Sequence, residues 1–208
     1  MSVNIGSDNS TDELRIDPIS KAARQTGYRT NGTVTPAYAT RDYYRASIST
    51  NLVAAASTSP FFAIQGSSSR VVRIIAIHYN GMTLTATAYQ TILCQKRSTA
   101  ISGGTATILT QVANDSLSPA GTLSVCNAYT AAPTAGTLIG TLDSQRFLGA
   151  DTTPTTLIAE DNKFDFYQDH EDGIVLRGTS EGITLSFATA PATAVTMALS
   201  VLWSESDV

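Results

Sequence analysis

The densest group of residues able to do chemistry is an acidic segment in the last third of the chain, Glu160–Gly173. Its carboxylates could coordinate Ca²⁺, which takes six to eight oxygen ligands, or act as the acid pair of a glycoside hydrolase. They could also form a negative rim that contacts an arginine-bearing face of a neighbour. The EF-hand spacing is absent, and Phe164 and Ile174 predict flanking strands, which leaves Gln168–Gly173 as a loop. A solvated, charged turn is the fourth interpretation.

Nucleophiles and metal ligands are few and scattered. His78 and His170 are the only histidines, and we expect His78 to be a strand-end imidazole with a backbone partner. No nucleophile elbow, P-loop or zinc-protease motif occurs. Cys94 and Cys126 do not form a Cys-x-x-Cys pair, so we expect two buried, small apolar side chains in a reducing compartment. The sequence does not show whether they pair. We predict no enzymatic activity, no cofactor and no metal site.

The single tryptophan, Trp203, falls on the apolar side of the last predicted strand. A core position is therefore expected for it, rather than a role in stacking on a ligand. No strand carries a row of exposed aromatic residues, so a carbohydrate-binding module is only the second interpretation.

The composition excludes several classes of protein. The chain has 208 residues, a net charge near −4 and only 14% charged residues, against roughly a quarter in an average domain. About 38% of the residues are Ala, Ser or Thr. The chain is too apolar to be disordered throughout and too poor in charge for a coiled coil. A pI of about 5.0 argues against binding nucleic acid by bulk charge.

Sequence features of membrane proteins and secreted proteins are not visible. The start of the chain has neither a basic region nor an apolar core of a signal peptide. The most continuous apolar stretches, such as Val71–Ile77, fall far short of the roughly 20 residues of a spanning helix. We therefore expect no membrane partner.

Charge is unevenly distributed. Residues 46–142 hold four basic residues and one acid, Asp115, whereas residues 143–208 hold three basic and eleven acidic residues. A surface poor in charge and rich in Thr and Ala is unusual for a soluble monomer. We infer that parts of the middle of the chain are covered by copies of the protein or by a partner.

Residues 1–45 are polar, contain several Gly and Pro residues and lack a clear period, which predicts an extended N-terminal docking arm. A short helix could form within it, at Asp12–Ala23. Tyr and Arg are enriched at protein interfaces, and a cluster of tyrosines and arginines lies at the end of the arm. The candidate interface residues are Tyr38, Arg41, Tyr43, Tyr44 and Arg45. The alternative is that these tyrosines cap one end of the core.

From residue 46 onward the pattern is β. Ser47–Ala56 and Arg70–His78 predict strands, and Asn80-Gly81 is a strong hairpin signal. Met82 and the alternate residues after it would then face the core, with Thr on the other side. In the last strand the apolar residues alternate cleanly from Val195 to Trp203. Roughly ten short strands without a fixed repeat predict an all-β fold, an antiparallel β-sandwich of jelly-roll type over residues 46–208.

Several strings in residues 60–205 resemble small β-rich virion proteins of tailed bacteriophages. They begin at Ala63, Lys96, Asp115, Ala128 and Leu176, and read AIQGSSSRVVRI, KRSTAISGGT, DSLSPA, AYTAAPT and LRGTSEG. The resemblance implies a structural role on the particle. It excludes the N-terminal arm, leaves open capsid surface, head fibre or tail, and assigns no functional residue.

Together these observations predict a non-enzymatic bacteriophage structural protein. We expect a capsid decoration (cement) protein that forms a homotrimer, binds the major capsid protein or another virion protein through its arm, and is located in the virion after assembly in the host cytoplasm. Arm exchange or addition of a strand to a neighbouring sheet edge would suit such docking. The alternative is a head fibre, tail or adhesin component that binds host-surface glycans.

Overall fold

The structure is a computed structural model that describes residues 2–4, 13–16, 23–25, 41–54, 57–83, 88–149, 162–167 and 173–207. The chain divides into two compact units, Met1–Thr40 and Arg41–Val208. The boundary therefore lies before the expected one at residue 45. Every regular element in the described residues is a strand.

In the first unit three short strands pair in the order β1-β2-β3, all antiparallel. They are β1 (Ser2–Asn4), β2 (Glu13–Ile16) and β3 (Ala23–Gln25). The short helix expected at Asp12–Ala23 is wrong, because β2 occupies its first half and β3 begins at its end. Leu14, Ile16 and Ile19 do not form the long apolar stripe that stabilises a helix by packing.

The second unit is an antiparallel β-sandwich of two six-stranded sheets, as predicted. One sheet has the order β11-β7-β14-β5-β10-β8, and the other β12-β6-β15-β4-β9 with β13 also paired to β6. The strands are β4 (Asp42–Val53), β5 (Phe62–Gln65), β6 (Arg70–Thr83), β7 (Ala88–Arg97), β8 (Thr105–Ile108), β9 (Val112–Ala113), β10 (Val125–Ala131), β11 (Leu138–Gly149), β12 (Asn162–Asp165), β13 (Ile174–Leu176), β14 (Gly182–Phe187) and β15 (Val195–Asp207).

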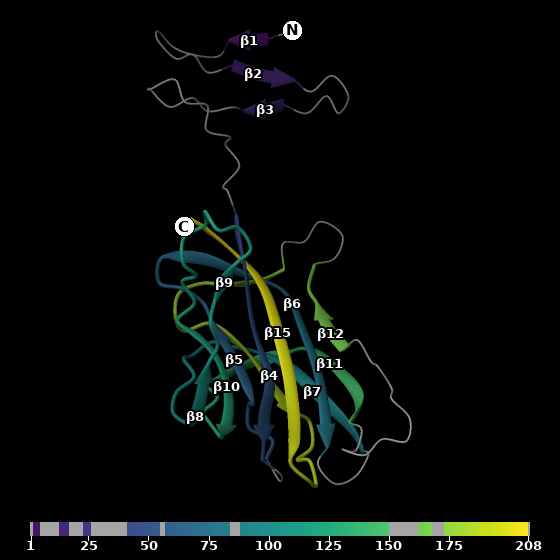
Figure 1. The fold of residues 1–208 in the computed structure, drawn as a ribbon. Coiled ribbons are helices and arrows are strands. Elements are labelled where there is room, and N and C mark those ends of the chain that lie inside the picture. The colour runs from purple at the N-terminus through teal and green to yellow at the C-terminus, as the bar shows by residue number, and fades with distance from the viewer. Residues whose placement is uncertain are drawn as a thin grey trace. The chain divides into compact units, whose positions relative to one another are not determined.

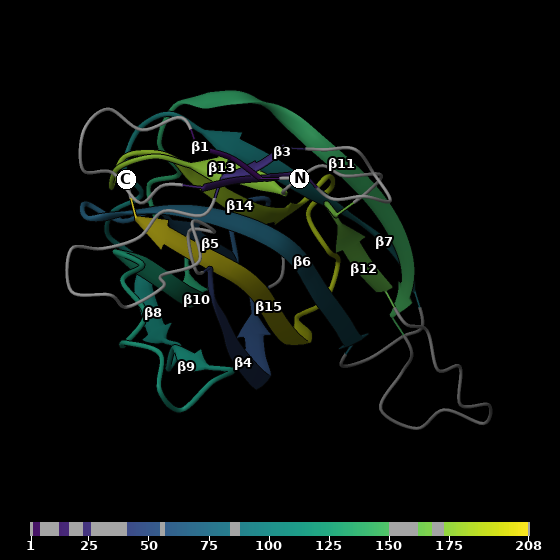
Figure 2. The same cartoon turned by 90° about the horizontal axis from the view of Figure 1, so that it is seen from above.

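The pairing of these strands is nested. The outermost pair is β4 with β15, followed by β5 with β14, β6 with β12 and β13, and innermost β7 with β11. The short strands β8, β9 and β10 are inserted between β7 and β11, and add to the edges of the two sheets. Figure 1 shows β4, β15 and β6 side by side, and Figure 2 shows the sheets as two layers.

The core lies between the two sheets and is built by strand alternation. Val195, Met197, Leu199, Val201 and Trp203 all point inward from β15 and are at most 3% exposed, so the predicted pattern of the last strand and the core position of the tryptophan are confirmed. Every second residue of a strand faces one side, and a central strand buried on one face is therefore strongly fixed in register.

A buried carboxylate lies at the end of the core where β15 ends. Glu205 is fully buried, and accepts hydrogen bonds from Trp203 Nε1 (2.9 Å), the Thr122 backbone N–H (3.0 Å) and Thr122 Oγ1 (2.7 Å). The Tyr44 ring stacks on Trp203 with centroids 5.6 Å apart, and its hydroxyl donates to the Pro119 carbonyl at 3.1 Å. The same residues therefore fix the loop before β10 to β4 and β15.

The predicted hairpin at Asn80-Gly81 is wrong. β6 continues through both residues to Thr83, and Gly81 pairs with Met197 of β15. A two-residue turn of the preferred type needs positive φ at its central residues, and Gly81 has no positive φ. The backbone pairs of β6 with β15 outweigh the local turn preference, because they extend along the whole strand.

This continuation reverses the face predicted for the end of β6. Thr83 is 1% exposed, whereas Met82 is 43% exposed. Alternation carried on from the buried Tyr79 places Met82 outside, since a shift of one residue moves every side chain to the other face. Leu84 and Ala86, which share the predicted apolar face, lie outside the described residues.

Two further strand boundaries differ from the expectation. β4 begins at Asp42 rather than Ser47, because Tyr44 and Ala46 are core residues that pair with Trp203 and Val201. Leu138–Gly149 is one long strand, β11, rather than two of the short strands expected from the sequence. Its register against β7 shifts at two bulges, one between Leu138 and Gly140 and one between Thr141 and Asp143.

We predict that Glu205→Gln lowers the free energy of unfolding by about 1–3 kcal/mol, because the amide offers one acceptor oxygen and adds two buried donors to a site that supplies donors. Urea unfolding of the full chain measures this. The matched control is Glu181→Gln, a carboxylate 33% exposed in its side chain, for which we expect a change of at most about 0.5 kcal/mol. Equal effects at both positions would contradict the role given to Glu205.

Candidate functional site

The predicted interface residues do not form one cluster. Tyr38 lies outside the described residues. Tyr44 is fully buried in the core. For this residue the alternative interpretation applies, in which the tyrosine belongs to one end of the core. Tyr43 and Arg45 are exposed and point away from the core, on either side of Tyr44 in β4, and Arg41 is half-buried just before the strand.

Tyr43 and Arg45 instead belong to a larger surface, the outer side of the sheet formed by β4, β15 and β6. We call it the β4–β15–β6 face. Its rows run across the three strands in the observed register: Tyr43, Ser204 and Arg73; Arg45, Leu202 and Ala76; Ser47, Ser200 and His78; Leu52, Thr196 and Met82. The face therefore brings Tyr43 and Arg45 of β4 together with residues of β15 and β6.

The β4–β15–β6 face is poor in charge and has exposed apolar residues at both ends. Tyr43 is 43% exposed at one end, and Leu52 (50%) and Met82 (43%) lie at the other. Among the outward residues of these rows the charged side chains are arginines, and none is an acid. Arg73 donates to Ser206 Oγ at 2.8 Å. Leu52 and Met82 were missed from the sequence, because Met82 was assigned to the core.

The outer sides of the two sheets differ in which of their side chains are buried. On the β5 sheet, Ile101 and Tyr129 pack against Ala63 as a second small apolar cluster, and the Arg97 guanidinium is buried against Thr184 Oγ1 at 3.1 Å. On the β4–β15–β6 face the outward Ser204 and Ala76 are 2% and 6% exposed, whereas Tyr43, Leu52 and Met82 are 43–50% exposed. Exposed apolar side chains on a sheet face of low charge are typical of a surface that contacts another molecule.

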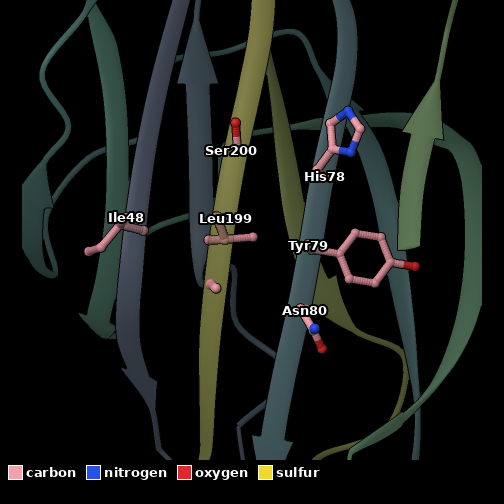
Figure 3. A pocket seen from close by; sticks show the side chains of 7 residues that line it. Ile48, His78, Tyr79, Asn80, Leu199 and Ser200 are labelled. Atoms are coloured by element: carbon pink, nitrogen blue, oxygen red, sulfur yellow. The ribbon is translucent and has the colours of Figure 1, made fainter. Parts of the chain in front are cut away.

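A shallow hollow of about 240 Å³ lies in the middle of the β4–β15–β6 face. Figure 3 shows Ser200 on β15 beside His78 on β6, with Ile48 on the neighbouring β4. The residues that line it are Ile48, His78, Tyr79, Asn80, Ala198, Leu199 and Ser200. Ser200 and His78 are direct cross-strand partners, which raises the question of a serine nucleophile with a histidine base.

The carboxylate and the backbone groups described near Ser200 are already paired. Asp165 is the nearby carboxylate on β12, but it pairs with Lys163 at 3.1 Å and accepts the Tyr167 backbone N–H at 3.2 Å. The hydrogen bond from Lys163 is the main cause that lowers the pKa of Asp165. Ser200 lies in a central strand whose backbone groups are used by β4 and β6. An oxyanion would need backbone or side-chain donors aimed at it, and paired strands do not offer them.

The acidic segment is described only in part. Its strand end Asn162–Asp165 is β12, whereas Glu160, Asp161 and residues 168–172 lie outside the described residues, so the loop and His170 are not placed. In the described part of the chain no group of three or more His, Cys, Asp or Glu residues could hold a metal ion. The same residues contain no helix long and apolar enough to cross a membrane.

Both cysteines are buried, as predicted, and both are free, which the sequence had left open. Cys94 lies on β7 and Cys126 on β10, and β14 and β5 separate them in the sheet. Three steps of about 4.8 Å place the strands about 14 Å apart, which is beyond the reach of a disulfide. Burial raises the pKa of both thiols, that of Cys126 to about 12.

Comparison of the chain with protein families, with curated proteins and with solved structures finds no match.

We predict that the protein loses stability as the pH rises above about 9, partly through these two thiols. Unfolded thiols ionise near their ordinary pKa while the folded ones stay protonated, so each contributes up to about 1.4 kcal/mol per pH unit. Urea unfolding between pH 8 and 10.5 measures the slope. The Cys94→Ala/Cys126→Ala variant, compared with wild type, should have a flatter profile. Identical slopes would contradict the buried, neutral state of the thiols.

Proposed function

We propose that this protein is a non-enzymatic structural subunit of a bacteriophage particle, a capsid decoration protein that coats or reinforces the shell as a homo-oligomer. The observation that carries the proposal is the β4–β15–β6 face. It exposes Tyr43, Leu52 and Met82 on a charge-poor sheet face. A subunit in an assembly gains by burying such a face, and many copies make even modest contacts sufficient.

The order of the strands supports a jelly roll within the sandwich. Nested pairs that alternate between two sheets, β4 with β15 and β5 with β14 and so on inward, are the arrangement of that architecture. Jelly rolls are common in viral capsid and lectin domains. A fold alone does not assign a function, so this point adds to the face and to the resemblance of the sequence strings.

A structural role also suits the chemistry of the hollow. The acid of β12, Asp165, is already paired with Lys163, and the backbone groups of Ser200 pair with β4 and β6. We predict that a fluorophosphonate probe, which labels activated serines, does not label the full chain. Labelling that is lost in Ser200→Ala would favour a hydrolase instead.

The position of the protein in purified virus particles tests the proposed function. We expect peptides of this chain in gradient-purified particles from its source, and antibody labelling on the capsid surface. Labelling on fibres or the tail, together with specific binding on a glycan array, would favour the adhesin alternative. Absence from the particles would contradict a virion role altogether.

The N-terminal unit provides the second part of this test. If residues 1–40 dock the subunit on the particle, a variant that lacks them should not bind particles free of the protein, while the full chain restores full occupancy. Circular dichroism of the variant shows whether the sandwich, whose core lies within Arg41–Val208, remains folded. Full decoration by a folded, truncated variant would contradict docking through the arm.

A further inference from the structure

We propose that the loop between β9 and β10 inserts the Leu117 side chain into an apolar pocket of the shell protein on which the N-terminal unit docks. The inference rests on the proposed function and deepens it, because it names the part of the sandwich that contacts the shell. The contact surface consists of Tyr43 and Arg45 of β4, Val112 of β9 and Leu117 of the loop, and we call it the Leu117 surface.

The loop is fastened to the start of β4 on both sides of Leu117. Before this residue, the Asn114 backbone N–H donates to the Tyr43 carbonyl at 2.7 Å. After it, Ser118 Oγ donates to Asp42 Oδ1 at 2.8 Å. The tip of the loop is therefore held in place by contacts that do not involve the Leu117 side chain.

The turn that carries Leu117 is closed by its own hydrogen bonds. Asp115 Oδ1 accepts the Leu117 backbone N–H at 2.9 Å, and the Asp115 carbonyl accepts the Ser118 N–H at 3.1 Å. The Leu117 side chain is 91% exposed, more than any other large apolar side chain of the described residues. A turn that is already ordered in the free protein loses little further backbone freedom on binding, which lowers the cost of association.

The residues around Leu117 have the composition of a binding surface. Val112 and Arg45 are cross-strand partners, and both are exposed. Tyr43, which is also exposed, lies beside Asn114 at the start of the loop. A single exposed leucine is ordinary on a protein surface, but tyrosine and arginine are typical of the residues that dominate binding energy. The matching partner surface is an apolar pocket with a carboxylate at its rim opposite Arg45.

The place of this surface along the chain identifies the shell as its partner. The N-terminal unit ends at Thr40 and β4 begins at Asp42, so the docking unit joins the sandwich next to the residues that hold the loop. Docking of this unit raises the effective concentration of the Leu117 surface at the shell, and a modest contact is then sufficient. Figure 1 shows β8 toward the opposite end of the sandwich from the start of β4. Its Ile108, apolar and 80% exposed, is therefore a matched control.

Protection of a thiol on the particle tests the contact. Leu117→Cys and Ile108→Cys each place an exposed thiol on the full chain, and Cys94 and Cys126 do not compete because both are buried. Each variant is bound to particles free of the protein, and its labelling by a maleimide is followed by mass spectrometry. We expect binding to slow the labelling of position 117 by about tenfold or more, and that of position 108 by less than about twofold.

Binding affinity provides a second measurement. Burial of a leucine side chain is worth about a factor of ten or more in affinity. Leu117→Ser should therefore raise the dissociation constant for the particles by about tenfold or more, whereas Ile108→Ser should change it by less than about twofold. Both side chains are exposed in the free chain, so neither substitution removes a core contact, and urea unfolding of the variants checks this.

Slower labelling and weaker binding at position 117 alone support the contact. Binding of the full chain with position 117 labelled at the free rate, or with position 108 protected instead, overturns it and leaves the proposed function intact. Protection of position 117 already in the free protein would assign the surface to a second copy, and also overturns the contact with the shell. Failure of the wild-type chain to bind particles overturns the proposed function and the contact together.

Discussion

The pairing of β15 with both β4 and β6 is the constraint on which the rest of the structure depends. These three strands join the end of the chain to residues 42–53 and 70–83, and their inner sides supply Trp203, Tyr44 and much of the core. The nested pairs of the other strands follow from this outermost pair, since each inward pair is connected to the one before it. Contacts so distant in the sequence are expected to form slowly during folding.

One consequence is that the inner and outer sides of β15 have different roles. Inward, large apolar residues alternate to fill the sandwich, and Glu205 is buried where Trp203 and Thr122 can donate to it. Outward, the same strand presents Thr196, Ala198, Ser200 and Leu202 on a charge-poor surface. The part of the chain that is poor in charge therefore contributes to one surface of the sandwich, and this is the surface that we assign to assembly.

The sequence predicted what depends on a local period and missed what depends on pairing. The alternation from Val195 to Trp203 is complete in one strand, so the core side of β15 and the all-β sandwich could be predicted. Asn80-Gly81 has the residue types of a turn, but partners in β15 hold it in a strand. The β4–β15–β6 face draws its rows from three distant segments, so no local pattern could bring Tyr43, Met82 and Thr196 together. The candidate interface at residues 38–45 was consequently only partly placed on that face.

The central claim is that this protein acts by assembly, through the outer side of β4, β15 and β6. A structure of the full chain in its native assembly tests it most directly. The account predicts that Leu52, Met82 and Ser200 are buried against another subunit there. An assembly in which this face is open to solvent, with all contacts made elsewhere, would contradict the account.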